Sequence, residues 1–244
     1  MITTITLNPA IDRMIEVTEF EFGRVHRVQK VVKSLGGKSI NVARILTGLD
    51  IKTQAVCFVG SRNLEEVKSF ANQDQIRLVT IEVDGYTRTN VKLIEPDCDY
   101  RTTDLNEPGF FISKEKLDKM TELIVEQAQI SDYVVLSGSL PAGIEANYYR
   151  ELALKLAKIT KVVIDADGVV LLEGMKGSPY LIKPNIHELE SALSRELHNE
   201  QEIVKACEEL IATYSIQYIL VSMGEKGSIL VGNQIALKAD IIPV

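Results

Sequence analysis

The segment Gly36-Gly37-Lys38-Ser39-Ile40-Asn41 has residue types and a spacing that suit an anionic ligand. Glycine lets the backbone approach a ligand closely, and free amide groups at the start of a helix attract negative charge. Lys38 adds a positive charge, and Asn41 follows one helical turn later. A polyol that carries a phosphate would use all of these groups. An ordinary glycine-rich turn before a helix explains the same residues, because short motifs also occur by chance.

Ser39 makes this segment look like the end of a P-loop, the phosphate-binding loop of many nucleotide-binding proteins. That motif requires another glycine five positions before Gly37, and the residue there is Val32. The segment is therefore not a P-loop. It is a Gly-Gly-Lys turn that leads into a predicted amphipathic helix over residues 40–46.

The composition limits the class of protein. With 244 residues, 45% hydrophobic and 25% charged, the chain can bury one sizeable core. Its net charge of -7 argues against nucleic acid or an anionic membrane as a partner. The three cysteines are odd in number and widely spaced, which excludes a disulfide framework, and neither a signal peptide nor a membrane-length apolar run is present. We expect a cytoplasmic protein.

Short apolar, β-branched runs alternate with helical patterns along the chain. We expect strands at 2–7, 53–59, 78–83, 134–136, 162–164, 180–182, 218–221 and 228–231. We expect helices at 114–129, 146–157, 188–194 and 200–214. This alternation predicts an α/β domain in which a mostly parallel sheet is covered by helices on both faces.

Two stretches, about 11–35 and 85–107, depart from that rhythm. Their apolar and charged residues alternate without a helical period, so they are expected to pair as a small sheet inserted into a single domain of residues 1–244. An open sheet with one apolar face must cover that face. We expect it to form a lid over the active site or a contact between two subunits.

Polar motifs follow several predicted strands at the point where each strand ends. These motifs are Asn8 to Asp12, Ser137 to Pro141, Lys183 to Asn185, and Ser222 to Gly224. Ligands of parallel sheets gather at the carboxyl ends of the strands. The coincidence predicts a binding site at this edge.

Taken together and in order, these motifs resemble the phosphofructokinase-B branch of the ribokinase family, and within it the 1-phosphofructokinases, with the tagatose-6-phosphate kinases next. The set that carries the resemblance is Asn8-Pro9-Ala10-Ile11-Asp12, Gly36-Gly37-Lys38, Asn41-Val42-Ala43, Thr87-Arg88-Thr89-Asn90, Ser137 to Pro141, Lys183-Pro184-Asn185 with Glu188, and Ser222 to Gly227. The resemblance implies a ribokinase-like three-layer α/β/α fold with a small β-sheet lid. It also implies Mg²⁺- and ATP-dependent phosphorylation of a sugar phosphate, fructose 1-phosphate to fructose 1,6-bisphosphate, and is compatible with a homodimer through the lid.

The resemblance also implies the substrate-binding residues. Sugar hydroxyls would be held by Asp12, Gly36, Gly37 and Asn41, and the phosphate already on the sugar by Lys38, Arg88, Ser139 and Arg27. The residue types suit these roles, because carboxylates accept from hydroxyls and guanidinium groups fork onto phosphate oxygens. A turn role for Asp12 and solvated lid positions for Arg27 and Arg88 remain open.

On the nucleotide side the resemblance implies two further groups. The nucleotide would be bound by Lys183, Asn185, Glu188, Ser222, Gly224 and Gly227, and Asn185 and Glu188 would help to position Mg²⁺ indirectly. Both groups have structural alternatives. Asn185 and Glu188 match a helix capping box, and the segment from Ser222 to Gly227 matches a hairpin turn.

The chain departs from the family pattern in two ways. Ser39 stands where the family commonly has glycine, so its side chain is expected near the substrate. The family's Gly-Ala-Gly-Asp element, which supplies the anion hole and the catalytic base, does not occur within residues 1–244 and is expected beyond Val244. We interpret Asp165 and Asp167 as a polar turn that faces the nucleotide side rather than a replacement base. The 244 residues are therefore expected to be inactive alone, as a C-terminally truncated kinase; a sugar-phosphate-binding fragment and an unrelated nucleotide-binding module are the alternatives.

Overall fold

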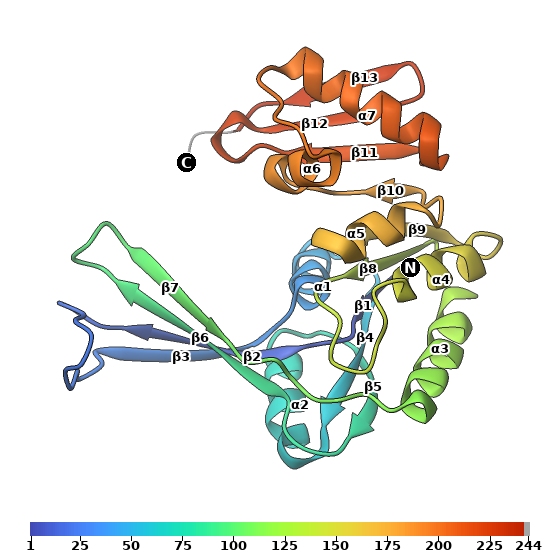
Figure 1. The fold of residues 1–244 in the computed structure, drawn as a ribbon. Coiled ribbons are helices and arrows are strands. Elements are labelled where there is room, and N and C mark those ends of the chain that lie inside the picture. The colour runs from blue at the N-terminus through green and yellow to red at the C-terminus, as the bar shows by residue number, and fades with distance from the viewer. Residues whose placement is uncertain (242–244) are drawn as a thin grey trace.

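The computed structural model describes residues 1–241, which form two sheets of different size (Figure 1). The larger sheet has the strand order β13-β12-β11-β10-β9-β8-β1-β4-β5. Its strands are β1 Ile2–Thr6, β4 Thr53–Gly60, β5 Leu78–Val83, β8 Tyr133–Ser137, β9 Lys161–Asp165, β10 Leu181–Ile182, β11 Tyr218–Ser222, β12 Ser228–Gly232 and β13 Ile235–Ala239. All pair in parallel except β12 and β13, which are antiparallel at one edge. Every run expected to be a strand is one, which confirms the α/β class.

Helices cover both faces of this larger sheet. They are α1 Lys38–Gly48, α2 Leu64–Gln73, α3 Lys114–Ala128, α4 Tyr148–Leu156, α5 Gly168–Met175, α6 Ile186–Leu193 and α7 Glu200–Tyr214. Residues of α1 and α2 pack with Ala55 and Cys57 of β4, and residues of α3 to α7 pack with the opposite face. Sequence periodicity did not predict α2 or α5. The α5 sequence, Gly-Val-Val-Leu-Leu-Glu-Gly-Met, is too uniformly apolar to show a helical period.

The face of the sheet that α1 covers continues across β8 to β12 with apolar side chains. The strand registers place Val135, Val163, Leu181, Leu220 and Leu230 on this face, and each is partly exposed. Their neighbours along each strand face the helices α3 to α7 and are buried. In this half of the sheet, helices α3 to α7 therefore cover one face, and the other face is partly exposed (Figure 1).

The smaller sheet, here called the lid sheet, projects away from the rest of the molecule, here called the body (Figure 1). Its strands are β2 Ala10–Glu16, β3 Lys30–Gly36, β6 Arg88–Glu95 and β7 Arg101–Asn106, in the order β3-β2-β6-β7. Only the central pair, β2 and β6, is parallel. The chain passes between body and lid sheet four times, at 7–9, Gly37, 84–87 and 107–113. These four crossings determine where the lid sheet sits.

No helix within residues 1–241 combines the length and the apolar character that a membrane crossing requires.

Candidate active site

Asp12 lies near the crossings, on the central strand β2 of the lid sheet. Its register partner on β6 is Asn90, whose Nδ2 donates a hydrogen bond of 3.1 Å to Asp12 Oδ1. The other carboxylate oxygen, Oδ2, lies against Gly36, where an added Cβ would be only 2.1 Å away. Burial raises the pKa of Asp12, opposed by the hydrogen bond from Asn90 and by nearby positive charges. Gly36 thus makes room for a partly desolvated carboxylate that can accept hydrogen bonds from hydroxyl groups.

Arg88 starts strand β6 and lies beside Ala10 in the register of β2. Its guanidinium donates to two backbone carbonyls, Glu107 O at 2.7 Å and Asn8 O at 3.1 Å. Its buried Nε has no hydrogen-bond partner among residues 1–241. The side chain is therefore held from two sides, and its two terminal nitrogens each carry a second N–H that these bonds do not use, which suits a phosphate ligand.

The Gly-Gly-Lys turn lies at the second crossing. Gly37 has φ +125°, and a Cβ there would meet the Thr6 side chain at 2.8 Å, so both the backbone and the space require glycine. Helix α1 begins without a side-chain cap, which leaves its first amide groups available for an anion. Asn41 is exposed one turn later, and its Oδ1 accepts from Arg44. The turn thus leaves backbone amide groups free at the start of α1, as an anion site requires.

Two further residues that the resemblance places on the sugar phosphate lie apart from each other. Ser139 is exposed in the loop after β8, and its Oγ accepts from Asn8 Nδ2 at 3.3 Å. Arg27 is exposed in the loop between β2 and β3, at the end of these strands away from the crossings. Asn8 thus connects Ser139 with Arg88, whereas these contacts do not include Arg27.

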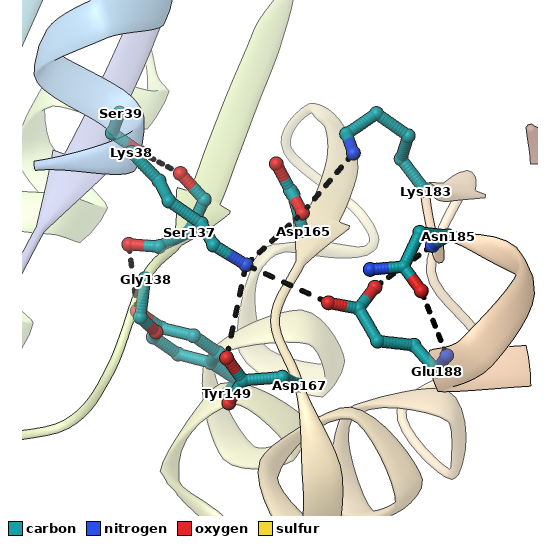
Figure 2. A network of polar contacts seen from close by, with 10 residues as sticks. All are labelled: Lys38, Ser39, Ser137, Gly138, Tyr149, Asp165, Asp167, Lys183, Asn185 and Glu188. Carbon is teal, nitrogen blue, oxygen red and sulfur yellow. Dashed lines mark hydrogen bonds and ion pairs between the residues drawn. The ribbon is translucent and has the colours of Figure 1, made fainter. Parts of the chain in front are cut away.

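Lys38 faces a group of carboxylates at the ends of the body strands (Figure 2). Its Nζ lies 3.6 Å from Asp165, 3.9 Å from Asp167 and 4.0 Å from Glu188. A second ammonium group, that of Lys183, lies 3.4 Å from the same oxygen of Asp165. Asp165 and Asp167 are therefore part of the polar cluster at this edge, and their contacts with lysine side chains add to the polar turn that the sequence predicts for them. Their place directly after an apolar strand, like that of the other motifs, was the available signal.

The Asn185 and Glu188 pair forms the predicted capping box. Asn185 Oδ1 accepts from the Glu188 amide at 2.8 Å, and Glu188 Oε2 accepts from the Asn185 amide at 2.8 Å. The second oxygen of the same carboxylate, Oε1, is the one that faces Lys38. The cap holds Glu188 in a fixed orientation and leaves one oxygen directed at the cluster, so the structural and functional interpretations are compatible.

The cluster suits an indirect role toward Mg²⁺. Within residues 1–241 no three His, Cys, Asp or Glu side chains are grouped closely enough to hold a metal ion. Mg²⁺ usually keeps several waters and is bound through one or two carboxylates together with substrate phosphates. The second oxygen of Glu188 and the carboxylate of Asp165 can accept hydrogen bonds from such waters, which is an indirect role.

The segment from Ser222 to Gly227 is the turn of a β11–β12 hairpin, as its structural alternative predicted. Ser222 forms an isolated bridge with Asn185, and its amide donates to Pro184 O at 3.1 Å. Gly227 has φ +81°, and a Cβ there would lie 2.0 Å from a backbone oxygen. A cavity of about 800 Å³ opens beside this turn, lined by residues that include Ile186, His187, Leu197, Met223 and Lys226. The hairpin turn therefore lies next to Asn185 and beside this cavity.

Ser39 does not have the position that the sequence analysis expected. Its side chain is fully buried, and its Oγ lies 2.5 Å from Ser137 Oγ and 3.4 Å from Val135 O (Figure 2). The hydroxyl faces strand β8 because the first turn of α1 packs on that strand. The side chain connects α1 to the sheet and does not project toward a ligand.

A mostly parallel sheet between two layers of helices, a separate lid sheet and a polar cluster at the carboxyl edge define a ribokinase-like fold. Comparison with known proteins agrees. Residues 5–244 match the model of the pfkB family carbohydrate kinases. The chain is 33% identical over 240 residues to the 1-phosphofructokinase of Haemophilus influenzae, covering 98% of this chain and 76% of that protein.

It is also 33% identical over 242 residues to the 1-phosphofructokinase of Bacillus subtilis, covering 99% of this chain and 78% of that protein. A solved structure described as a possible 1-phosphofructokinase from Thermotoga maritima superimposes with a TM-score of 0.85 at 27% identity, covering 97% of this chain and 76% of the other. The chain belongs to the pfkB family of carbohydrate kinases. By that membership it is an ATP-dependent sugar kinase, a transferase, which confirms the class that the sequence resemblance implied.

Proposed function

We propose that this site binds fructose 1-phosphate and directs the terminal phosphoryl group of ATP to its free primary hydroxyl, giving fructose 1,6-bisphosphate. The relatives named 1-phosphofructokinase support this choice. The observation that carries it is that Asp12 and Arg88 lie on adjacent lid strands, two register positions apart, at the ends of these strands next to the body. A hydroxyl acceptor beside a phosphate-binding guanidinium matches a sugar that already carries a phosphate.

In this proposal the sugar end has three tasks. Asp12, Gly36, Gly37 and Asn41 hold the sugar hydroxyls, with the carboxylate of Asp12 as a hydrogen-bond acceptor. Arg88 and Ser139 bind the phosphate already present, and the free start of α1 adds amide groups for negative charge. Arg27 joins them only if the loop between β2 and β3 folds over the site, so its role is the least supported of the set.

Lys38 is better placed for the incoming phosphoryl group than for the sugar phosphate. Its ammonium group faces Asp165, Asp167 and Glu188 rather than Arg88. A lysine held by loose ion pairs exchanges them easily for phosphate oxygens, because its charge sits on a flexible stem. We therefore place Lys38 between the two substrates, where it offsets the negative charge that builds up as phosphate moves.

At the nucleotide end, the same proposal gives ATP and Mg²⁺ to the cluster around Asn185 and Glu188. Lys183 contributes a positive charge, and Ser222, Gly224 and Gly227 form a turn with little side-chain bulk beside the phosphates. When bound, Mg²⁺ would offset the negative charge of the ATP phosphates, with Asn185 and Glu188 positioning it indirectly.

We propose further that residues 1–244 alone bind both substrates but transfer phosphate very slowly. One oxygen of Asp165, Oδ1, faces both Lys38 and Lys183, and this sequence range contains no Gly-Ala-Gly-Asp element. Loss of base and anion hole removes most of the rate of phosphoryl transfer. Turnover by the purified 244-residue protein at the rate of an ordinary kinase, about 1 to 100 per second, would contradict this part of the proposal.

The lid sheet supports a proposal about assembly. On the face opposite Asp12, the register aligns Ile15 with Val31 and Leu93, and Val91 with Leu105. Val31 and Leu105 are 39% and 57% exposed. A second copy of the lid would cover this apolar face. Light scattering of the parent chain and of Leu105→Lys tests it, with a dimer expected for the parent and a monomer for the variant.

The substrate is tested by calorimetric titration of the purified chain with fructose 1-phosphate, tagatose 6-phosphate and fructose. We expect fructose 1-phosphate to bind most tightly and fructose, which lacks the phosphate, to bind at least about a hundredfold more weakly. Tighter binding of tagatose 6-phosphate would change the proposed substrate but leave the proposed binding site in place. Equal affinity for the phosphorylated and unphosphorylated sugars would overturn the site assignment itself.

A further inference from the structure

Asn8 is a buried residue at the first crossing between body and lid sheet, and its exposed fraction is 5%. Its Nδ2 donates to Pro108 O at 3.2 Å and to Ser139 Oγ at 3.3 Å, and its own carbonyl accepts from Arg88 at 3.1 Å. The register of β1 with β8 explains the Ser139 contact. Ile5 pairs with Leu136, and Asn8 and Ser139 each follow three residues later, in the segments directly after these two strands.

These contacts connect parts of the molecule that the chain otherwise joins only at the crossings. Asn8 belongs to the first crossing, Pro108 to the fourth, Arg88 begins the lid strand that follows the third, and Ser139 belongs to the body. Two of the three contacted residues, Arg88 and Ser139, are the ones proposed to hold the sugar phosphate. The distance between a lid residue and a body residue is thus set through one amide side chain and its backbone carbonyl.

Gly109 shows how closely the fourth crossing packs against this amide. A Cβ at position 109 would lie 2.3 Å from Asn8 Oδ1, and Gly109 has φ +89°. Asn8 Oδ1 has no hydrogen-bond partner among residues 1–241. A buried polar atom without a partner costs stability, which indicates that the amide is kept for what its other groups hold.

We propose that Asn8 is a positioning residue that sets the spacing of Arg88 and Ser139 for the sugar phosphate by tying the lid sheet to the body. This inference rests on the proposed function. Asn8 acts through the two residues it contacts and not on the substrate itself. Small displacements of groups that hold a ligand cost much of the binding free energy, so loss of the tie weakens binding without removing a ligand contact.

The test compares Asn8→Ala with a matched control, Gln54→Ala, in calorimetric titrations of the purified chain. Gln54 is fully buried, donates two side-chain hydrogen bonds, to Thr3 and to Gln127, and also has an unpartnered oxygen. It belongs to the amino-terminal end of strand β4, away from the crossings. We expect both variants to lose thermal stability, but only Asn8→Ala to lose affinity for fructose 1-phosphate, by about 10- to 30-fold. Affinity for ATP should stay unchanged in both.

A double-mutant cycle with Gly109→Ala measures whether the two substitutions affect sugar phosphate affinity independently. A merely structural role of Asn8 predicts that their effects add. Alone, Gly109→Ala pushes against Asn8 Oδ1 and should weaken sugar phosphate binding about tenfold. In the Asn8→Ala background the obstructing oxygen is gone, so the second change should cost less affinity. The backbone strain at position 109 is present in both backgrounds and cancels in the cycle. Additive losses would show that the two residues act independently and would overturn the inference.

Hydrogen exchange of the unliganded protein, together with the titrations, distinguishes failure of the proposed function from failure of the inference about Asn8. In Asn8→Ala, the backbone amides of residues 107–113 should exchange faster, while those of the body strands stay protected. If Asn8→Ala does not fold, the same exchange pattern is expected for Gly109→Ala. If the parent chain binds no sugar phosphate, the proposed function fails and this inference with it. If the parent binds fructose 1-phosphate and Asn8→Ala binds it equally well, only the inference fails.

Discussion

The two ends of the proposed site, one assigned to the sugar phosphate and one to the nucleotide, are built by different means. At the sugar end, Asp12 and Arg88 are held by hydrogen bonds of 2.7 to 3.1 Å to neighbouring lid residues and to backbone carbonyls. At the nucleotide end, Lys38 and Lys183 face carboxylates at 3.4 to 4.0 Å, with their side chains more than a third exposed.

This difference teaches how each end should respond to change. Short hydrogen bonds to partly buried groups fix geometry and are little affected by salt. Looser ion pairs that involve partly exposed ammonium groups act through charge, and salt screens exposed charges over about 8 Å at physiological ionic strength. Removal of one group at the sugar end should therefore cause a large loss of ligand affinity. Removal of one group at the nucleotide end should cause a smaller loss that depends on salt.

The largest effect is expected for Arg88→Ala. It removes the phosphate-binding guanidinium and also the contacts to Glu107 and Asn8, so affinity for fructose 1-phosphate should fall by about a hundredfold or more. Calorimetric titration at low and high salt checks it. Arg88→Lys keeps the charge and serves as the control, with partial recovery expected. Unchanged affinity in Arg88→Ala would remove the sugar phosphate from this end.

Asp12→Asn should lower sugar phosphate affinity by about 10- to 50-fold while leaving the fold at least as stable at pH 7. The raised pKa of Asp12 means that the folded chain holds this proton more tightly than the unfolded chain. Stability from this group is therefore lost as the pH rises from the ordinary value of 3.8 through the raised pKa, and asparagine removes that loss.

The raised pKa of Asp12 also predicts how the affinity for sugar phosphate depends on pH. Affinity of the parent chain should fall as the pH is lowered through the raised pKa, because the protonated carboxyl accepts hydroxyl hydrogen bonds less well. Titrations from pH 4 to pH 8 check it, with Asp12→Asn as the control that corrects for protonation of the sugar phosphate. The same pH dependence in both proteins would show that Asp12 does not meet the sugar.

Lys38→Met tests which end Lys38 serves. Its contacts predict a loss of ATP affinity of about tenfold that shrinks at high salt, with sugar phosphate affinity nearly unchanged. Fluorescence titration with a labelled ATP analogue and calorimetry with fructose 1-phosphate measure the two. The reverse pattern would return Lys38 to the sugar phosphate, as the sequence resemblance implied.

Glu188→Gln separates the cap from the charge. Glutamine at this helix position still completes a capping box, so thermal stability should change little while Mg²⁺-dependent ATP binding weakens several-fold. Glu188→Ala is the comparison, and it should also lose about 1 kcal/mol of stability with the cap. Equal ATP binding in the parent and in Glu188→Gln would leave the cap as the only role of this residue.

The smallest effect is expected for Ser39→Gly, which restores the residue common in the family. The change removes the hydrogen bond to Ser137 and adds a glycine to the first turn of α1, so stability should fall by about 1 to 2 kcal/mol. Affinity for both substrates should stay the same. Chemical denaturation and the titrations above check it, and a gain in sugar phosphate affinity would place Ser39 near the substrate after all.

Sequence periodicity predicted most of the fold because buried strands and amphipathic helices leave regular apolar patterns. The runs at 53–59 and 218–221 are strands β4 and β11, and the run at 200–214 is helix α7. Helix α5 was missed because a helix this apolar has no periodic pattern. The two-residue strand β10 was visible only as part of a longer apolar run.

The sequence by itself also determined which residue types surround the site, since glycine, lysine and asparagine at fixed spacing need no tertiary contact to be noticed. It did not determine which way the side chains face. The orientation of Lys38 toward Asp165, the burial of Ser39 and the contacts of Asn8 depend on parallel pairing of strands more than 90 residues apart. Only the tertiary structure decides such contacts, because strand register and helix packing set them and neither is a property of a local segment.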